Sequence, residues 1–318
     1  MKLVIATQEG SLVFDELLGS IEGLEIVRVD STAEALPELG DADVFYGFPS
    51  DEVVATAPNL RLLQTPSAGV DFLMRLHALR ESDIPLANTR GAHAPSIAEH
   101  AFSLLLALTR GLPSCFGWQK DKEWPRSLEI YRMPREIMGS TMGIIGYGEI
   151  GRAIAQRASA FGMKILAVDA HPKFDAPYVG DVWPVDRLHE MLAESDVVAV
   201  AAPLTKETHH VLNAAAFAAM KPGCYLIAIS RGGVVDEGAL ADALELGHLA
   251  GAGLDVAEIE PLDGESRLWN APNLIITPHL AGSSLQKETR CVAILRENIM
   301  RLQKGEPLIN LVDKQLGY

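Results

Sequence analysis

The feature that most constrains the fold of this chain is the alternation of short apolar runs with segments of helical periodicity along its whole length. Runs such as KLVIAT, DVFYGF, MGIIG and YLIAIS have the length of single buried strands. Between them lie segments such as VDFLMRLHALR and EGALADALELG, which have the apolar pattern of helices. Short apolar strands that alternate with helices predict βαβ units and parallel sheets buried on both faces. The expected fold class is therefore α/β.

Chain length and two helical segments predict the domain organisation. The chain has 318 residues, which is too many for one ordinary core, so two domains are expected. The segment SIAEHAFSLLLALTRGL is apolar on nearly every side, as expected of a helix between domains or at a subunit interface. The amphipathic segment QKETRCVAILRENIMRLQKG is expected to return the chain to the first domain. We predict two doubly wound parallel-sheet domains, one of residues 1–97 and 288–318 and one of residues 98–287.

Charge and composition disfavour several classes of function. The formal net charge is −15, whereas nucleic acids and anionic membranes attract clustered Lys and Arg. The first residues, MKLVIATQEGS, contain neither the apolar core of a secretory signal nor a membrane span. Three widely spaced cysteines are typical of reduced thiols, so a cytoplasmic protein is expected. No metal site is predicted, and the adjacent His209 and His210 are interpreted as a solvated turn.

The sequence GIIGYGEIGR carries the pattern G-x-G-x-x-G at Gly146, Gly148 and Gly151. The pattern follows an apolar strand and opens a helix, and Asp169 ends the next strand. This context favours a dinucleotide site over an ordinary turn, because the glycines permit a tight turn, a close pyrophosphate and close helix packing. Asp169 would accept hydrogen bonds from the adenosine ribose and repel the additional phosphate of NADP. NAD is therefore predicted, and the nearby His171 and Lys173 would allow some use of NADP.

Polar residues follow the last three strands of the same region. Arg231 follows YLIAIS, Glu260 follows GAGL after a short loop, and His279 follows LIITP. Ligands of open α/β sheets bind outside the carboxyl ends of the strands, so these side chains are expected to converge there. Arginine binds a carboxylate through two parallel hydrogen bonds, and histidine exchanges a proton near neutral pH. The carboxylate of Glu260 would favour the imidazolium form of His279, and Asp255 would order the loop or contact the cofactor.

In these motifs the chain resembles the D-isomer-specific 2-hydroxyacid dehydrogenases. SAGVDFL, SIAEHAFSLLLALTR, GIIGYGEIGR, APLTKETHHVLN, GAGLDVAEIEPL and NLIITPHLAG occur in the order typical of that family. The resemblance implies a Rossmann NAD-binding domain at 98–287 and a smaller, flavodoxin-like substrate-binding domain. It also implies a homodimer formed through the NAD-binding domains. The site residues that it implies are Arg231, Glu260 and His279 for catalysis, with Arg231 also binding the substrate carboxylate; Ser67, Ala68 and Gly69 for substrate binding, together with His279; and Gly146, Gly148, Glu149, Ile150, Gly151, Asp169, Ala202, Pro203, Thr208, Ser230 and Asp255 for the cofactor.

The expected function is hydride transfer between NAD and a small 2-oxo or D-2-hydroxy acid, with glyoxylate or hydroxypyruvate as the first choice. Two alternatives remain open. One is an NAD(H)-sensing binding protein, like the corepressors that share this fold, and the other is a short phosphoglycerate dehydrogenase. Trp124 and Arg126 lie in a region that reaches the partner's active site in some members of the family.

Overall fold

The computed structural model describes residues 1–7, 11–315 and 317. The chain divides into two compact units. Unit 1 comprises Met1–His93 and Ser283–Tyr318, and unit 2 comprises Ala94–Gly282.

Each boundary between the units lies beside a long helix. Helix α5 (Ala94–Thr109) begins unit 2, and helix α12 (Leu285–Lys304) follows the return to unit 1. The boundaries expected from the sequence, after residues 97 and 287, fall inside these two helices. A helix keeps its hydrogen bonds within one segment, so a division at its end disrupts fewer contacts than one within it.

Unit 1 is built on a parallel sheet with the strand order β2-β1-β3-β4-β5. Side chains of β1 alternate between two cores, as a strand covered on both faces requires. Leu3 and Ile5 pack with residues of α1 and α12, while Val4 packs on the other face. The elements are β1 (Lys2–Ala6), α1 (Ser11–Leu18), β2 (Glu25–Val29), α2 (Thr32–Ala35), β3 (Val44–Gly47), α3 (Asp51–Thr56), β4 (Leu62–Gln64), α4 (His77–Glu81), β5 (Leu86–Ala87) and α12.

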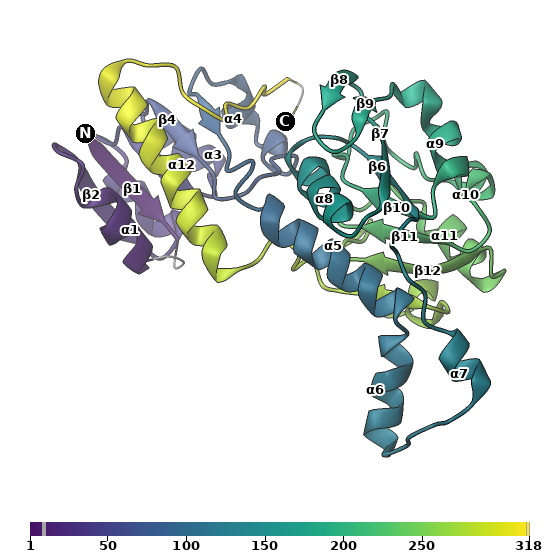
Figure 1. Ribbon diagram of the computed structural model, residues 1–318. Helices are drawn as coiled ribbons and strands as arrows, with labels where there is room; N and C mark the ends of the chain where they lie inside the picture. The colour runs from purple at the N-terminus through teal and green to yellow at the C-terminus, as the bar shows by residue number, and fades with distance from the viewer. Residues whose placement is uncertain (8–10, 316, 318) are drawn as a thin grey trace. The chain divides into compact units, whose positions relative to one another are not determined.

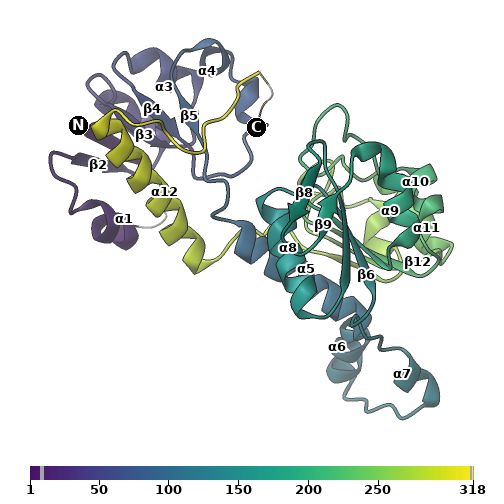
Figure 2. The same cartoon turned by 45° about the horizontal axis from the view of Figure 1, so that its top comes forward.

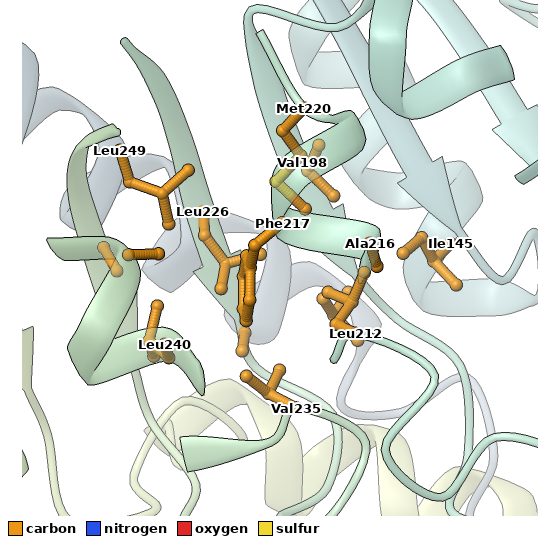
Figure 3. Close-up of a cluster of buried hydrophobic side chains, with 14 of the residues drawn as sticks. Ile145, Val198, Leu212, Ala216, Phe217, Met220, Leu226, Val235, Leu240 and Leu249 are labelled. Atoms are coloured by element: carbon orange, nitrogen blue, oxygen red, sulfur yellow. The ribbon is translucent and has the colours of Figure 1, made fainter. Parts of the chain in front are cut away.

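Unit 2 is built on a second parallel sheet, with the strand order β13-β12-β11-β10-β6-β7 (Figures 1 and 2). One face packs against α5 and α8, and the other packs against α9, α10 and α11. Figure 3 shows the second of these cores, in which Phe217 of α10 lies among Leu226, Leu240 and Leu249. The elements are α6 (Leu112–Asp121), α7 (Leu128–Arg132), β6 (Thr141–Ile145), α8 (Glu149–Ala160), β7 (Lys164–Val168), β8 (Lys173–Ala176), β9 (Gly180–Val182), α9 (Leu188–Glu194), β10 (Val197–Val200), α10 (Ala214–Ala219), β11 (Cys224–Ala228), α11 (Glu237–Glu245), β12 (Leu249–Leu254) and β13 (Leu274–Ile276).

Short 3₁₀ segments connect some of these elements, and their bounds are η1 (Leu36–Glu38), η2 (Leu73–Arg75), η3 (Val185–Arg187) and η4 (Arg267–Asn270). The antiparallel hairpin of β8 and β9 follows β7. Within the described residues, we find no helix that combines the length and apolarity needed to cross a membrane.

The two covered parallel sheets confirm the predicted doubly wound α/β fold. In unit 2 the chain passes from β6 outward to β7 and then returns to the opposite side of β6 at β10. The strand order therefore reverses between β6 and β10. Ligands of such sheets bind at this reversal, outside the carboxyl ends of the strands.

Candidate active site

The glycine loop connects β6 to α8 at the reversal of strand order. Gly146 has φ +91°, a backbone conformation that favours glycine. A Cβ at Gly146 would lie 2.6 Å from the backbone nitrogen of Ala202, and one at Gly151 would lie 2.1 Å from the carbonyl oxygen of Gly146. These two glycines therefore permit the tight turn and the close packing of the helix that the sequence predicts.

Gly148 differs from the other two glycines because the space beside it is open. It caps the N-terminus of α8, and a Cβ built there would meet no described atom within 4 Å. Glu149 and Ile150 form the first turn of the helix. Free N–H groups and the helix dipole favour an anion at such an N-terminus. The loop thus fits the pyrophosphate of a dinucleotide.

Asp169 follows β7 and lies against the glycine loop. One carboxylate oxygen accepts a hydrogen bond from the N–H of Tyr147 at 2.6 Å, and the other accepts one from the N–H of His171 at 2.8 Å. Tyr147 is fully buried between the glycines, and its hydroxyl donates to the carbonyl of Pro177 beyond β8. Burial raises the pKa of Tyr147. The buried ring is an anchor of the loop that sequence reasoning missed.

A rigid turn follows β10 next to the glycine loop. It begins at Ala202, whose backbone contacts Gly146 as described above. Thr208 stabilises the turn, because its hydroxyl donates to the carbonyl of Pro203 at 2.6 Å and accepts from the N–H of Thr205 at 2.7 Å. Ala202 therefore lies beside the predicted cofactor loop, and Thr208 holds Pro203 within the same turn.

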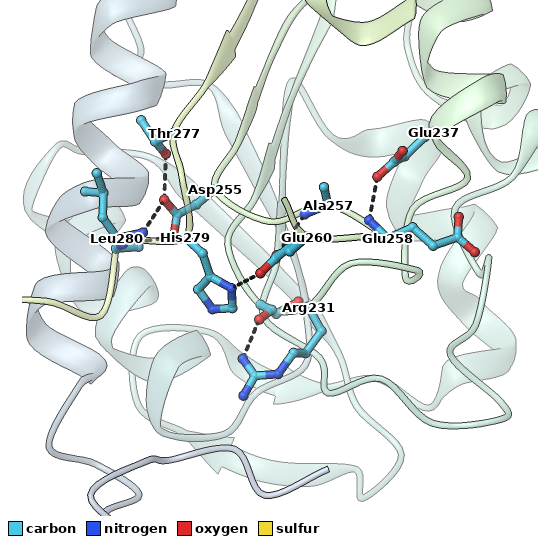
Figure 4. A network of polar contacts seen from close by, with 11 residues as sticks. Arg231, Glu237, Asp255, Ala257, Glu258, Glu260, Thr277, His279 and Leu280 are labelled. Atoms are coloured by element: carbon cyan, nitrogen blue, oxygen red, sulfur yellow. Dashed lines mark hydrogen bonds and ion pairs between the residues drawn. The ribbon is translucent and has the colours of Figure 1, made fainter. Parts of the chain in front are cut away.

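Arg231, Glu260 and His279 follow β11, β12 and β13, which are neighbours in the parallel sheet. Figure 4 shows the three side chains gathered at this edge. The Nδ1 atom of His279 lies 2.7 Å from a carboxylate oxygen of Glu260, and the N–H of Ala257 donates to the other oxygen at 3.0 Å. The side chains of His279 and Glu260 are 44% and 38% exposed. The predicted pair is therefore formed and open to a small molecule.

The turn that carries Arg231 packs directly on the loop that carries Glu260. A Cβ at Gly232 would lie 1.8 Å from the carbonyl oxygen of Ala257, so the glycine after Arg231 is needed for this contact. The guanidinium of Arg231 donates to the carbonyl of Ser230 at 2.8 Å. The hydroxyl oxygen of Ser230 is buried and finds no hydrogen-bond partner among the described residues. An unpaired buried hydroxyl at this edge is consistent with a bound polar ligand group.

Asp255 has a different environment from Glu260, although both follow β12. Its side chain is 1% exposed, and its carboxylate accepts from the hydroxyl of Thr277 at 2.6 Å and from the N–H groups of Leu280 and Ala281 at 3.0 and 2.8 Å. His100 of α5 lies 3.5 Å away through Nε2. The carboxylate thus holds the Thr277 side chain before His279 and the backbone after it. Of the two roles expected of Asp255, ordering the loop is the one supported by these contacts.

Residues 102–281, more than half of the chain, match a family model described as the D-isomer specific 2-hydroxyacid dehydrogenase, NAD binding domain. The chain belongs to this family. It is therefore an oxidoreductase that acts on a CH–OH donor and uses a nicotinamide cofactor, as the glycine loop and the polar strand ends predict. The resemblance drawn from the sequence motifs is confirmed.

Individual members of the 2-hydroxyacid dehydrogenase family match along most of the chain. The glyoxylate reductase of Thermofilum pendens is 34% identical over 299 residues, 90% of this chain and 86% of that protein. A crystal structure of a family protein from Aeromonas salmonicida is 33% identical, with a TM-score of 0.86 over 98% of this chain and 99% of that chain. The NADPH-dependent glyoxylate/hydroxypyruvate reductase of Sinorhizobium meliloti, solved with NADP and sulfate, is 27% identical, with a TM-score of 0.84 over 100% and 99%.

Ser67, Ala68 and Gly69, the residues implied to bind substrate, lie in unit 1 shortly after β4. The hydroxyl of Ser67 donates to the carbonyl of Gly69 at 2.7 Å, and the side-chain amide of Asn88 donates to the carbonyl of Ala68 at 2.9 Å. These bonds hold the segment in a defined loop. Asn88, which sequence reasoning missed, fixes the middle of that loop from the end of β5.

The cysteines lie outside this chemistry. All three are free thiols, with Cys115 exposed and Cys224 and Cys291 buried. Burial raises the pKa of the Cys224 thiol to about 12, which makes it a poor nucleophile.

Proposed function

We propose that this dehydrogenase reduces small 2-oxo acids of the glyoxylate or hydroxypyruvate type with NADH. The observation that carries the proposal is the bonded Glu260–His279 pair, which stands with Arg231 at the strand ends of the nucleotide-binding sheet. The names of the relatives from Thermofilum pendens and Sinorhizobium meliloti support the same substrate class.

The protein groups have distinct roles in the proposed reaction. A bound nicotinamide supplies or accepts the hydride at the substrate's C2. Arg231 binds the substrate carboxylate and polarises the neighbouring keto oxygen. With Nδ1 of His279 bonded to Glu260, the Nε2 atom is left to donate a proton to that oxygen, or to remove it in the reverse direction. Glu260 orients the ring through this hydrogen bond.

The proposed cofactor site combines the glycine loop, the turn after β10 and the ends of β7 and β11. Its residues are Gly146, Gly148, Glu149, Ile150, Gly151, Asp169, Ala202, Pro203, Thr208 and Ser230, with Asp255 acting through the loop that it fixes. Asp169 favours NAD, because its carboxylate would repel an adenosine 2′-phosphate.

The NAD preference is tested by comparing kcat/KM with NADH and NADPH for the parent chain and for Asp169→Ala. The parent is expected to prefer NADH, and the variant to narrow that preference by about tenfold or more, because hydrogen bonds to a charged group contribute about 1.5–3 kcal/mol. A parent chain that prefers NADPH would contradict the assignment.

Unit 1 is proposed to bind the substrate through the backbone of Ser67, Ala68 and Gly69, and unit 2 to bind the cofactor. We also propose that the protein is cytoplasmic and forms a homodimer through unit 2. The segment of α6 and α7, which projects from the sheet of unit 2 in Figure 1, supports the dimer. It exposes large apolar side chains, which commonly mark a protein interface, and Trp124 among them would approach the partner. The exposed residues are Phe116, Trp124, Leu128 and Tyr131.

The proposed reaction is tested by initial rates of NADH and NADPH oxidation with glyoxylate, hydroxypyruvate, pyruvate, phenylpyruvate and 2-oxoisocaproate. Strong turnover with glyoxylate or hydroxypyruvate is expected. Binding of NADH without turnover of any of the five acids would favour an NAD(H)-sensing protein. Oxidation of 3-phosphoglycerate in preference to the reduction of these acids would favour a short phosphoglycerate dehydrogenase.

A further inference from the structure

Two adjacent histidines and a glutamate converge on the surface of unit 2, outside the acid–base pair. His209 Nε2 lies 3.7 Å from one carboxylate oxygen of Glu258, and His210 Nε2 lies 3.2 Å from the other. One ligand atom from each residue lies within 4.8 Å of the other two. We infer that His209, His210 and Glu258 form a binding site for a divalent transition cation of the zinc class.

The spacing of the three side chains suits such a cation. Zinc binds imidazole nitrogen and carboxylate oxygen at about 2.0–2.2 Å in a tetrahedron, which places neighbouring ligand atoms about 3.3–3.6 Å apart. The separations from the Glu258 carboxylate, 3.2 Å to His210 and 3.7 Å to His209, lie on either side of this range, each at a different oxygen. The three ligand atoms lie within 4.8 Å of one another, so side-chain rotations that shorten the longer separations would bring all three to bonding distance. Imidazole with carboxylate also suits zinc better than magnesium or calcium, which prefer oxygen ligands alone.

The backbone holds both histidines on the same side of their turn. Successive side chains of an extended chain point in opposite directions, but His210 has φ +50° and its ring stacks on that of His209 at 4.0 Å between centroids. The N–H of His210 donates to the carbonyl of Gly233 at 2.7 Å, and that of His209 to Thr205 at 3.0 Å. The turn is thus fixed before any cation binds.

Glu258 comes from a separate segment and is also held in place. Its N–H donates to the carboxylate of Glu237, at the start of α11, at 2.6 Å. Figure 4 shows the Glu258 carboxylate pointing away from Glu260 and His279. A cation at this site would therefore join the turn after β10 to the loop that carries Glu260 without occupying the acid–base pair.

An ion pair of two imidazolium rings with one carboxylate explains the cluster less well than a bound cation. Neutral rings protonated at Nε2 could also bond the carboxylate, and the zinc titration below distinguishes that arrangement from a cation site. If both stacked rings were charged, they would repel each other at this separation. A cation bound to both Nε2 atoms places positive charge opposite Glu258 while the rings stay neutral.

The test is calorimetric titration of ZnCl₂ into the full chain, prepared without an affinity tag and treated with a chelator. We expect saturable binding of one zinc per chain. Glu258→Gln and His209→Ala are each expected to weaken the affinity by at least about 10–100-fold, since removing even an outer-shell partner has an effect of that size. The exposed Glu265 and His189 supply matched controls, and Glu265→Gln and His189→Ala are expected to bind zinc like the parent.

Thermal unfolding gives an independent measurement on the same proteins. Zinc should raise the unfolding temperature of the parent and of both controls equally, and that of Glu258→Gln and His209→Ala by less, because stabilisation by a ligand falls as its affinity falls. Binding of NADH verifies that each variant is folded. If only one of Glu258→Gln and His209→Ala folds, the zinc affinity of that variant is sufficient for the test. The proposal is overturned if the parent shows no saturable binding, or if a folded ligand variant binds zinc as tightly as the parent.

Discussion

Asp255 and Glu260 lie in the same loop, yet the surroundings of the two carboxylates differ. Asp255 is 1% exposed, and its oxygens accept hydrogen bonds from Thr277, Leu280 and Ala281. Glu260 is 38% exposed and bonds the imidazole of His279 and one N–H group. The Asp255 carboxylate is placed to hold the loop backbone, and the Glu260 carboxylate is placed to act on the imidazole of His279.

This difference separates two measurable quantities. Loss of a buried acceptor leaves donors unsatisfied in a low-dielectric interior, so it should lower the free energy of unfolding. Loss of an exposed acceptor leaves its donors to water, so stability should change little. Turnover should depend on both residues, because each acts on His279. Asp255 acts by holding the position of the loop that carries His279, and Glu260 acts through the charge of its carboxylate.

The largest effect is expected for His279→Asn. Asparagine tolerates the left-handed backbone at this position, φ +51°, but cannot transfer a proton. Turnover should fall by about 10²–10⁴-fold, the usual contribution of general acid–base catalysis, while the dissociation constant of NADH stays nearly constant. Steady-state kinetics and a fluorescence titration with NADH measure the two quantities, with His189→Asn as the surface control. Turnover equal to that of the parent would end the assignment of His279.

Asp255→Asn is expected to have the next largest effect, on stability as well as on rate. The amide that replaces one carboxylate oxygen is itself a donor and would face the donors of the loop. The free energy of unfolding should fall by about 1–3 kcal/mol, and turnover should fall with it because the backbone around His279 is released. Urea unfolding monitored by circular dichroism gives the first value. An unchanged midpoint would show that the buried network contributes little.

The sequence predicts the surroundings of Glu260 better than those of Asp255. The parallel sheet rule brings Arg231, Glu260 and His279 together because each follows a strand, and strand ends share an edge. No comparable rule relates His100 of α5 to Asp255, or Tyr147 to Pro177 beyond β8. These contacts depend on how helices and hairpins pack on the sheet, and one sequence does not reveal that packing. The contact of His209 and His210 with Glu258 also depends on such packing, so the sequence did not predict it.

Glu260→Gln should lower turnover by about five- to tenfold. Glutamine can still accept a hydrogen bond from Nδ1, but a bond to a charged group is stronger by about 1 kcal/mol than one to a neutral group. The free energy of unfolding should change by no more than about 0.5 kcal/mol, because the side chain is partly exposed. Comparison of this variant with Asp255→Asn separates the effect of the Glu260 charge on turnover from the effect of the position of the His279 loop. A loss of stability as large as that of Asp255→Asn would remove the distinction between the two carboxylates.

Thr277→Val is expected to give the smallest change and tests the buried side of the comparison alone. Valine has nearly the shape of threonine but lacks the hydroxyl that donates to Asp255 at 2.6 Å and lies 2.9 Å from His100 Nε2. Loss of one such hydrogen bond should lower the free energy of unfolding by about 0.5–1.5 kcal/mol. Two backbone donors would still hold Asp255, so turnover should fall by less than in Asp255→Asn. The loss in free energy of unfolding for the double variant Thr277→Val/Asp255→Asn should be smaller than the sum for the two single variants, since both changes weaken the same hydrogen bond. Strict additivity would mean that the hydroxyl of Thr277 stabilises the fold through its other neighbours, His100 Nε2 and the carbonyl of Leu254.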